Sequence, residues 1–172
     1  MPVIAALAAS ALSLVYGVYL IFDILGKPTG TPKMVEIAEA IQQGASAYLK
    51  RQYATVTVIA AVLAVVIWYF LGSLTAIGFL VGAALSALAG IVGMWVAVRA
   101  NVRTAEAAKG GLAQAFALAF KGGAVTGFLV VGLALGGVAL FYALTNNLDA
   151  LIGLGFGGSL ISVFARLGGG IY

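Results

Sequence analysis

Long apolar segments alternate with short polar breaks along the whole chain. Five of these segments are long enough to cross a hydrocarbon layer roughly 30 Å thick as a helix rising about 1.5 Å per residue. The predicted spans are residues 3–25, 53–71, 74–98, 122–144 and 150–172. The pattern therefore predicts an all-α fold, a polytopic membrane bundle of five transmembrane helices. Residues 1–172 form one membrane-embedded region in this interpretation.

Some of the predicted helices extend beyond their spans. Residues 33–52 carry an amphipathic pattern with helical period, and the second span follows without a break. Thr31 followed by Pro32 is typical of an N-cap and a first helical residue. We expect this helix to project about five turns out of the bilayer. Polar residues 99–109 are expected to prolong the third helix, and residues 112–120 to begin the fourth outside the bilayer.

Small residues recur four positions apart within the apolar segments. This spacing lets helix backbones approach closely, so we expect these positions to pack against neighbouring helices. The alternative for each is a glycine that lines an ion path. The positions are Gly78, Gly82, Ser86 and Gly90, then the pairs Gly123–Gly127, Gly132–Gly136, Gly153–Gly157 and Gly155–Ser159.

The basic residues all fall on one side of the five-span arrangement. Positive charge accumulates in cytoplasmic loops of membrane proteins. The sequence thus predicts cytoplasmic connections at 26–33 and 109–112, a cytoplasmic C-terminus and an N-terminus outside. The nine residues are Lys27, Lys33, Lys50, Arg51, Arg99, Arg103, Lys109, Lys121 and Arg166.

Composition excludes several classes of protein. With 63% hydrophobic and 8% charged residues and a mean hydropathy of +1.16, the chain is not a soluble domain. It has no Cys and no His, which excludes disulfides, thiol chemistry and the usual zinc sites. The net charge of +4 is spread over loops and helix ends, so we expect no nucleic-acid partner. Residues 1–3 lack the basic region of a cleavable signal peptide.

The acidic residues do not predict a hydrolytic centre. Glu36 and Glu39 share a helix face and are expected to be solvated, while Asp23 and Asp149 lie at span ends. A metal-assisted hydrolytic centre needs several acids that converge within a few ångströms. No glycine run continues into the GK[ST] of a phosphate-binding loop.

Basic residues at the predicted helix ends have two open interpretations. Arg99 and Arg103 lie one turn apart, and Glu106 is placed to relieve part of their repulsion. They either anchor the helix to anionic lipid headgroups or dock against an acidic site elsewhere. For Lys50 and Arg51 we expect side chains that snorkel to the membrane surface.

Arg166 is the candidate functional residue of the chain. It lies roughly 24 Å along the fifth span from Ala150, still inside the hydrocarbon layer. No acidic residue between Ala150 and Tyr172 offsets its charge. An intramembrane charge is by default a functional hypothesis, so we expect a partner from outside the chain, with a structural salt bridge as the alternative. Residues 168–170 are glycines and the chain stops at Tyr172, which we interpret as a cut within a longer protein.

Four motifs in register resemble one family. GASAYLKRQY at 44–53, GIVGMWVAVRANVRTAEAA at 90–108, KGGAVTG at 121–127 and FARLGGGIY at 164–172 are similar to the N-terminal part of membrane-bound inorganic pyrophosphatases. These are the pyrophosphate-energised H⁺ or Na⁺ pumps. The resemblance covers essentially the whole chain.

The resemblance implies a homodimer with about sixteen spans per subunit, embedded in the lipid bilayer. It implies hydrolysis of magnesium pyrophosphate at a cytoplasmic funnel, with a cation moved beneath it. The family's gate arginine in FARLGGGIY matches Arg166. The catalytic Asp and Lys segments, the substrate and metal ligands and the gate acids have no counterpart here. We therefore expect the 172-residue chain alone to be inactive and to need the remaining helices of the same protein.

The resulting prediction is the N-terminal five-helix portion of a pyrophosphate-energised pump, with H⁺ favoured over Na⁺ and Mg²⁺ as cofactor. The expected location is a prokaryotic cytoplasmic (inner) membrane. Potassium dependence is left open. The alternative function is a stand-alone five-span membrane pore or scaffold without enzymatic activity, which predicts a genuine stop after Tyr172 and a partner that supplies acids to Arg166.

Overall fold

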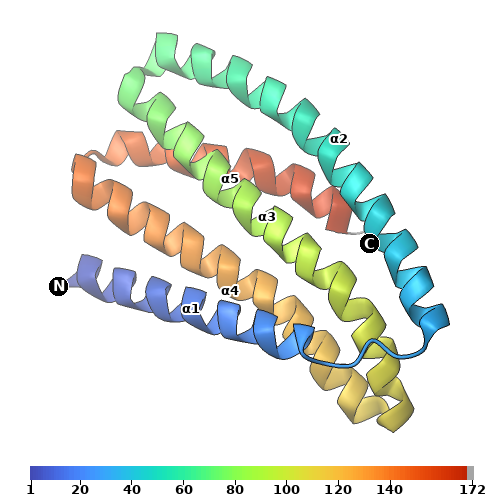
Figure 1. Ribbon diagram of the computed structural model, residues 1–172. Helices are drawn as coiled ribbons and strands as arrows, with labels where there is room; N and C mark the ends of the chain where they lie inside the picture. The colour runs from blue at the N-terminus through green and yellow to red at the C-terminus, as the bar shows by residue number, and fades with distance from the viewer. Residues whose placement is uncertain (170–172) are drawn as a thin grey trace.

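The computed structural model describes the backbone of residues 1–169 and the side chains of residues 1–164. Five α-helices run up and down in chain order (Figure 1). They are α1 (Pro2–Leu25), α2 (Pro32–Leu71), α3 (Ser73–Ala107), α4 (Leu112–Thr145) and α5 (Leu148–Gly169), with a 3₁₀ turn η1 (Ala108–Gly110) after α3. The described part of the chain contains no strand, which confirms the all-α prediction.

Four of the helices are long and apolar enough to cross a membrane. These are α1, α2, α3 with its 3₁₀ turn, and α4. The described apolar part of α5, Leu148–Phe164, is shorter. The fold is therefore a polytopic helical membrane protein with at least four candidate spans, and the predicted fifth span, 150–172, reaches beyond the described residues.

Single residues of special conformation end or begin the helices. Thr31 accepts a hydrogen bond from the Met34 amide at 3.4 Å, which confirms the predicted N-cap of α2. Gly72 and Gly111 have φ angles of +90° and +116°, values that favour glycine and that reverse the chain between helices. Asn146 ends α4 with φ 48° in the left-handed region.

The polar beginning of α2 and its apolar second half form one helix of 40 residues. At about 1.5 Å per residue such a helix is roughly 60 Å long, about twice the thickness of the hydrocarbon layer. The extensions predicted for α3 and α4 are also continuous with their spans. Three helices thus project from the same end of the bundle.

Helix α3 lies at the centre of the bundle and packs against α2, α4 and α5 (Figure 1). One buried cluster joins α1, α3 and α4 around Ile24, Val96 and Val125, all fully buried. A second joins α2, α3 and α5 through Val56, Ala83 and Ile161. Large apolar side chains remain exposed along the outer faces, as expected of a surface in contact with lipid.

Glycines bring α3 and α5 into backbone contact. A Cβ on Gly78 or Gly82 would overlap the carbonyl of Ala150 or Leu154, respectively. On the facing helix, a Cβ on Gly153 or Gly157 would overlap carbonyls of α3. The predicted close packing is confirmed for these four residues, because each position leaves no room for a side chain.

The other predicted small-residue pairs differ from one another in whether they pack against a described helix. Gly132 and Gly136 pack against Ser10 of α1, as expected. A Cβ added at Gly123, Gly127 or Gly155 would meet no atom of the described residues within 4 Å. The packing predicted for Gly123–Gly127 finds no partner among the described residues, because that face of α4 points away from the other described helices.

Candidate functional site

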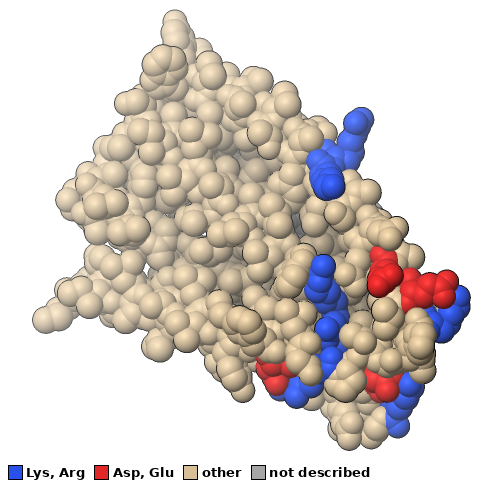
Figure 2. Space-filling view, in the orientation of Figure 1, with Lys and Arg blue, Asp and Glu red and all other residues tan. Residues whose placement is uncertain are grey.

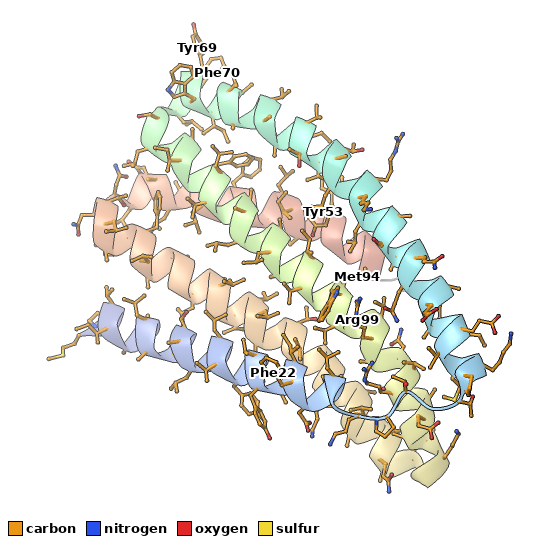
Figure 3. The ribbon with its side chains drawn as sticks, viewed as in Figure 1. Phe22, Tyr53, Tyr69, Phe70, Met94 and Arg99 are labelled. Carbon is orange, nitrogen blue, oxygen red and sulfur yellow. The ribbon has the colours of Figure 1, made fainter. Side chains whose placement is uncertain are left out.

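Charged residues gather at one end of the bundle, and the opposite end visible in Figure 2 carries none. We call this region the charged end. It comprises Asp23, Lys27, Lys33, Glu36, Glu39, Lys50, Arg51, Arg99, Arg103, Glu106, Lys109 and Lys121. At the other end, Tyr69 and Phe70 of α2 project outward (Figure 3), and Asp149 lies in the first turn of α5. The predicted one-sided distribution of basic residues thus holds for those that the structure describes.

Arg103 joins α3 to the end of α1. Its Nε donates to the Lys27 carbonyl and its Nη2 to the Leu25 carbonyl, both at 3.1 Å. Its Nη1 donates to the Arg99 carbonyl at 2.8 Å. The last carbonyls of a helix have no partner within the helix, so the guanidinium supplies donors that α1 lacks. Partial burial lowers the pKa of Arg103 from its ordinary value, and the group remains charged at neutral pH.

Asp23 joins α1 to α4 through Lys121 and also binds Lys27. Lys121 Nζ donates to Asp23 Oδ2 at 2.7 Å, and Lys27 Nζ lies 3.2 Å from Oδ1. The carboxylate side chain is 19% exposed, whereas the lysine side chains are 46% (Lys27) and 42% (Lys121) exposed. The hydrogen bond to Asp23 raises the pKa of Lys121. Asp23 therefore lies at the end of its span, as predicted, and holds two ammonium groups from different segments.

Glu106 does not pair with Arg103, contrary to the prediction. Its Oε2 lies 2.5 Å from Lys109 Nζ, one turn further along the chain. Arg103 instead points toward the backbone after α1, which draws it away from the carboxylate. Gly30, with φ +84°, lies directly over Glu106, where a Cβ would overlap the carboxylate. The connection between α1 and α2 is thereby held against α3.

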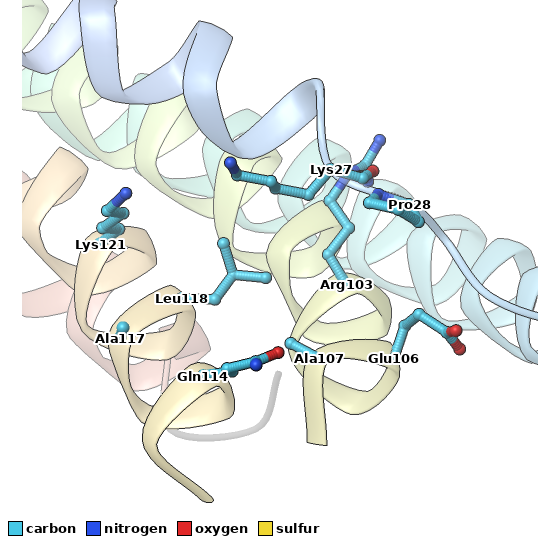
Figure 4. Close-up of a pocket in the computed structure, with 9 residues that line it drawn as sticks. All are labelled: Lys27, Pro28, Arg103, Glu106, Ala107, Gln114, Ala117, Leu118 and Lys121. Atoms are coloured by element: carbon cyan, nitrogen blue, oxygen red, sulfur yellow. Dashed lines mark hydrogen bonds between the residues drawn. The ribbon is translucent and has the colours of Figure 1, made fainter. Parts of the chain in front are cut away.

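A cavity of about 410 Å³ opens at the charged end between α1, α3 and α4 (Figure 4). Three basic side chains and one acidic side chain line it, together with Gln114 and an apolar floor. The lining residues are Lys27, Pro28, Arg103, Glu106, Ala107, Gln114, Ala117, Leu118 and Lys121. The positive charge of this lining suits an anionic ligand.

Arg99 lies on the other side of α3, toward α2 (Figure 3). Its guanidinium carbon lies 4.1 Å from the centre of the Trp95 ring, and Nη1 donates to the Trp95 carbonyl at 2.9 Å. A second cavity of about 510 Å³ follows this side, lined in part by Lys50 and Tyr53. Both interpretations of Arg99, lipid anchoring and docking against an acidic site, stay predictions.

The acidic residues of α2 form no metal centre. Glu36 pairs with Lys33 at 2.9 Å, and both side chains are exposed by about 70% (69% and 72%). Glu39 is also exposed, as predicted for a solvated face. Within the part of the chain that the structure describes, no three acidic side chains converge on a point where a metal ion could bind.

Arg166, the predicted ion-transport gate, lies on the last turns of α5. Its side chain is outside the described residues, so its partner and its role stay predictions.

The sequence did not predict the contacts that Arg103 and Lys121 make. Arg103 donates to backbone carbonyls, and Lys121 pairs with Asp23, 98 residues away. Neither partner leaves a local signal in the sequence.

Continuous helices with apolar outer faces and charge at one end define a polytopic helical membrane protein. The model of one protein family, described as inorganic H⁺ pyrophosphatase, matches residues 11–172. The chain therefore belongs to this family.

Several proteins similar to the chain carry names that describe proton pumps. A K⁺-insensitive pyrophosphate-energised proton pump of Methanosarcina mazei is 49% identical over 166 residues, covering 95% of this chain. A second such pump, of Moorella thermoacetica, is 44% identical over 96% of the chain. A pyrophosphate-energised membrane proton pump of Arabidopsis thaliana is 37% identical over 94%. The chain spans about a quarter of the length of these curated relatives.

Proposed function

We propose that the chain is the membrane-embedded N-terminal part of a pump that couples hydrolysis of inorganic pyrophosphate to proton transport. One observation carries the proposal: nearly the whole chain aligns, at up to 49% identity, with relatives named as pyrophosphate-energised proton pumps. The five-helix bundle would supply part of the transmembrane structure, and the charged end would form part of the wall around the hydrolytic site.

The charged end faces the cytoplasm in this proposal, and the N-terminus lies outside. The support is the gathering of the described basic residues at that end, since cytoplasmic loops carry an excess of Lys and Arg. The membrane is the inner membrane of a prokaryote. Higher identity to the Methanosarcina mazei and Moorella thermoacetica proteins than to the Arabidopsis thaliana protein supports this location.

Pyrophosphate and its Mg²⁺ are bound by other parts of the full-length protein. Residues 1–164 do not fit a metal site, because their acidic side chains do not converge. The test is the pyrophosphatase activity of the purified 172-residue chain with excess Mg²⁺, beside the full-length protein. We expect hydrolysis by the full-length protein alone. Hydrolysis by the short chain would contradict this division, and no hydrolysis by either would contradict the proposed activity.

Arg166 is the gate residue of the transport path in this proposal. A charge so deep in an apolar helix needs a carboxylate partner, which the rest of the protein would supply. In the full-length protein, we expect Arg166→Ala to reduce pyrophosphate-driven transport in vesicles much more than the amount of protein inserted in the membrane. Unchanged transport would refute the role of Arg166.

Two further properties complete the proposal. The protein works as a homodimer, and it needs no K⁺, as the names of the first two relatives state for those proteins. Pyrophosphate hydrolysis should then be the same in K⁺ and in K⁺-free buffer at equal ionic strength. A several-fold stimulation of pyrophosphate hydrolysis by K⁺ would contradict K⁺ independence. A monomeric mass in mild detergent would contradict the homodimer.

A further inference from the structure

One edge of the cavity between α1, α3 and α4, where Lys27 and Lys121 lie, is at the level where apolar segments end. Lys27 follows the end of α1 at Leu25, and Lys121 directly precedes the predicted span 122–144. The two ammonium groups therefore lie at the boundary between hydrocarbon and water. Phospholipid headgroups occupy this level in a bilayer.

The two lysines are held in place and yet accessible. Both bind the same carboxylate, Asp23, at 3.2 Å from Lys27 and 2.7 Å from Lys121. Almost half of each lysine side chain is exposed, and both lie near Leu118 in the cavity (Figure 4). An ammonium group has three N–H donors, and the contact with Asp23 occupies one donor of each lysine. The remaining donors can reach a second anion in the cavity.

Apolar and aromatic side chains lie on the helices next to the lysines. Leu118, on the cavity wall, is 6% exposed. On the outer surface of α1, Tyr19 is 60% and Phe22 72% exposed, and Phe120, next to Lys121 in the chain, is 68% exposed. Exposed aromatic rings beside cations are typical of the membrane–water interface.

We propose that this cavity binds the phosphodiester headgroup of an anionic phospholipid, with the Lys27 and Lys121 ammonium groups as donors to the phosphate oxygens. Arg103 adds positive charge, although its guanidinium serves mainly the carbonyls at the end of α1. Basic pockets between transmembrane helices are known to bind such headgroups. The proposal depends only on the chain being in a membrane.

The test is native mass spectrometry of the full-length protein in mild detergent, titrated with dioleoyl-phosphatidylglycerol. Each Lys or Arg near a membrane surface changes the affinity for anionic lipid by about fivefold. We therefore expect Lys27→Gln and Lys121→Gln each to weaken binding about fivefold, and Lys27→Arg to retain it. Lys27→Gln leaves the Asp23–Lys121 pair that joins α1 to α4. Lys121→Gln removes that pair, but the hydrogen bonds of Ser10 and Ser13 to α4 and the buried cluster around Ile24 and Val125 remain, so α1 should stay in place.

Lys33→Gln is the matched control. It removes the same charge from the same end, at a side chain 72% exposed and outside the cavity. We expect it to leave binding unchanged within about twofold. Equal losses in Lys27→Gln and Lys33→Gln would overturn the proposal, because the effect would then be one of net charge alone. Equal binding of dioleoyl-phosphatidylcholine would overturn it as well.

A soluble phosphate ion offers the same oxygen acceptors as the lipid headgroup. A competition experiment with inorganic phosphate therefore distinguishes a lipid ligand from a soluble one. We expect an excess of inorganic phosphate to leave the bound phosphatidylglycerol in place, because the apolar wall holds the lipid by its glycerol and acyl portion. Displacement of the lipid by inorganic phosphate would overturn the lipid assignment in favour of a soluble anion.

Discussion

Helices α5 and α1 both pack on the bundle, but they are held by different means. At α5 the contact is backbone against backbone, because glycines of α3 and α5 face one another's carbonyls. At α1 the contact includes hydrogen bonds from side chains. Ser10 Oγ donates to the Gly132 carbonyl at 2.6 Å and Ser13 Oγ to the Phe128 carbonyl at 2.9 Å. At the charged end, Arg103 donates to the Leu25 carbonyl and Lys121 donates to Asp23.

The difference predicts how each contact responds to mutation. Where two helix backbones touch because glycines carry no side chain, any added atom must push the two helices apart. Where a hydrogen bond or an ion pair makes it, a substitution removes one interaction among several, worth about 1 kcal/mol each. The α3–α5 contact should therefore tolerate almost no change, and the attachment of α1 should weaken by small steps.

The largest effect is expected at Gly82. Gly82→Leu places a side chain on the Leu154 carbonyl and should lower the free energy of unfolding by about 3 kcal/mol, the upper range for overpacking. Unfolding of the full-length protein in mixed detergent and SDS measures this. The matched control is Gly155→Leu, because a Cβ there meets no described atom within 4 Å. Equal losses at both positions would contradict the account of the α3–α5 contact.

The next effect is expected at Arg103. Arg103→Gln removes the donors to the Leu25 and Lys27 carbonyls. Hydrogen bonds from charged groups contribute about 1.5–3 kcal/mol, and at this partly exposed site we expect a loss of about 2 kcal/mol in the free energy of unfolding. Arg99→Gln, one turn earlier, should cost less than 1 kcal/mol, because among the described residues Arg99 bonds to its own helix and the Trp95 ring. A larger loss for Arg99→Gln would reverse the roles assigned here.

A smaller effect is expected at Ser10. Its hydroxyl is buried (4% exposed) and donates across the α1–α4 contact. Hydrogen bonds between membrane helices contribute about 0.6 kcal/mol on average, so Ser10→Ala should lower stability by about that amount. Ser10→Leu serves as the comparison, since it would also collide with Gly136 and should cost several times more. Equal effects of the two substitutions would show that α1 does not lie as close to α4 as described.

The smallest effect is expected at Asp23. Asp23→Asn removes the charge that attracts Lys27 and Lys121, which are both nearly half exposed. Exposed ion pairs contribute little to stability, so the loss at low salt should be smaller than the one at Ser10. It should shrink further at high ionic strength, because salt screens exposed charges. A loss that does not change with salt would indicate a structural hydrogen bond instead of an ion pair.

The sequence predicted the helices well, because their signals are local. Thr31–Pro32, the glycines at 72 and 111, and the polar residues 145–149 lie where the helices begin and end. The continuous amphipathic and apolar parts of α2 were also predictable from periodicity. Contacts between helices were predictable only in part. Gly78, Gly82, Gly153 and Gly157 pack as expected, but the same spacing at Gly123–Gly127 meets no helix among the described residues.

The spacing of small residues marks a face that can pack closely, but it does not say which helix covers that face. The same limit applies to charge. Glu106 was expected beside Arg103 from its spacing, yet Arg103 turns to the carbonyls at the end of α1. Every residue has the same backbone carbonyl, so only the fold shows which carbonyls need a donor. Likewise, the pairing of Lys121 with Asp23 depends on α1 and α4 lying side by side.

In the proposed function, this bundle is part of a pump driven by pyrophosphate, and its charged end faces the cytoplasm. The most direct test is to reconstitute the full-length protein in liposomes with a pH-sensitive dye inside and to add pyrophosphate and Mg²⁺ outside. We expect the interior to become acidic through the molecules whose charged end faces outward, and an uncoupler to abolish the change. Hydrolysis of pyrophosphate without any acidification would contradict the claim.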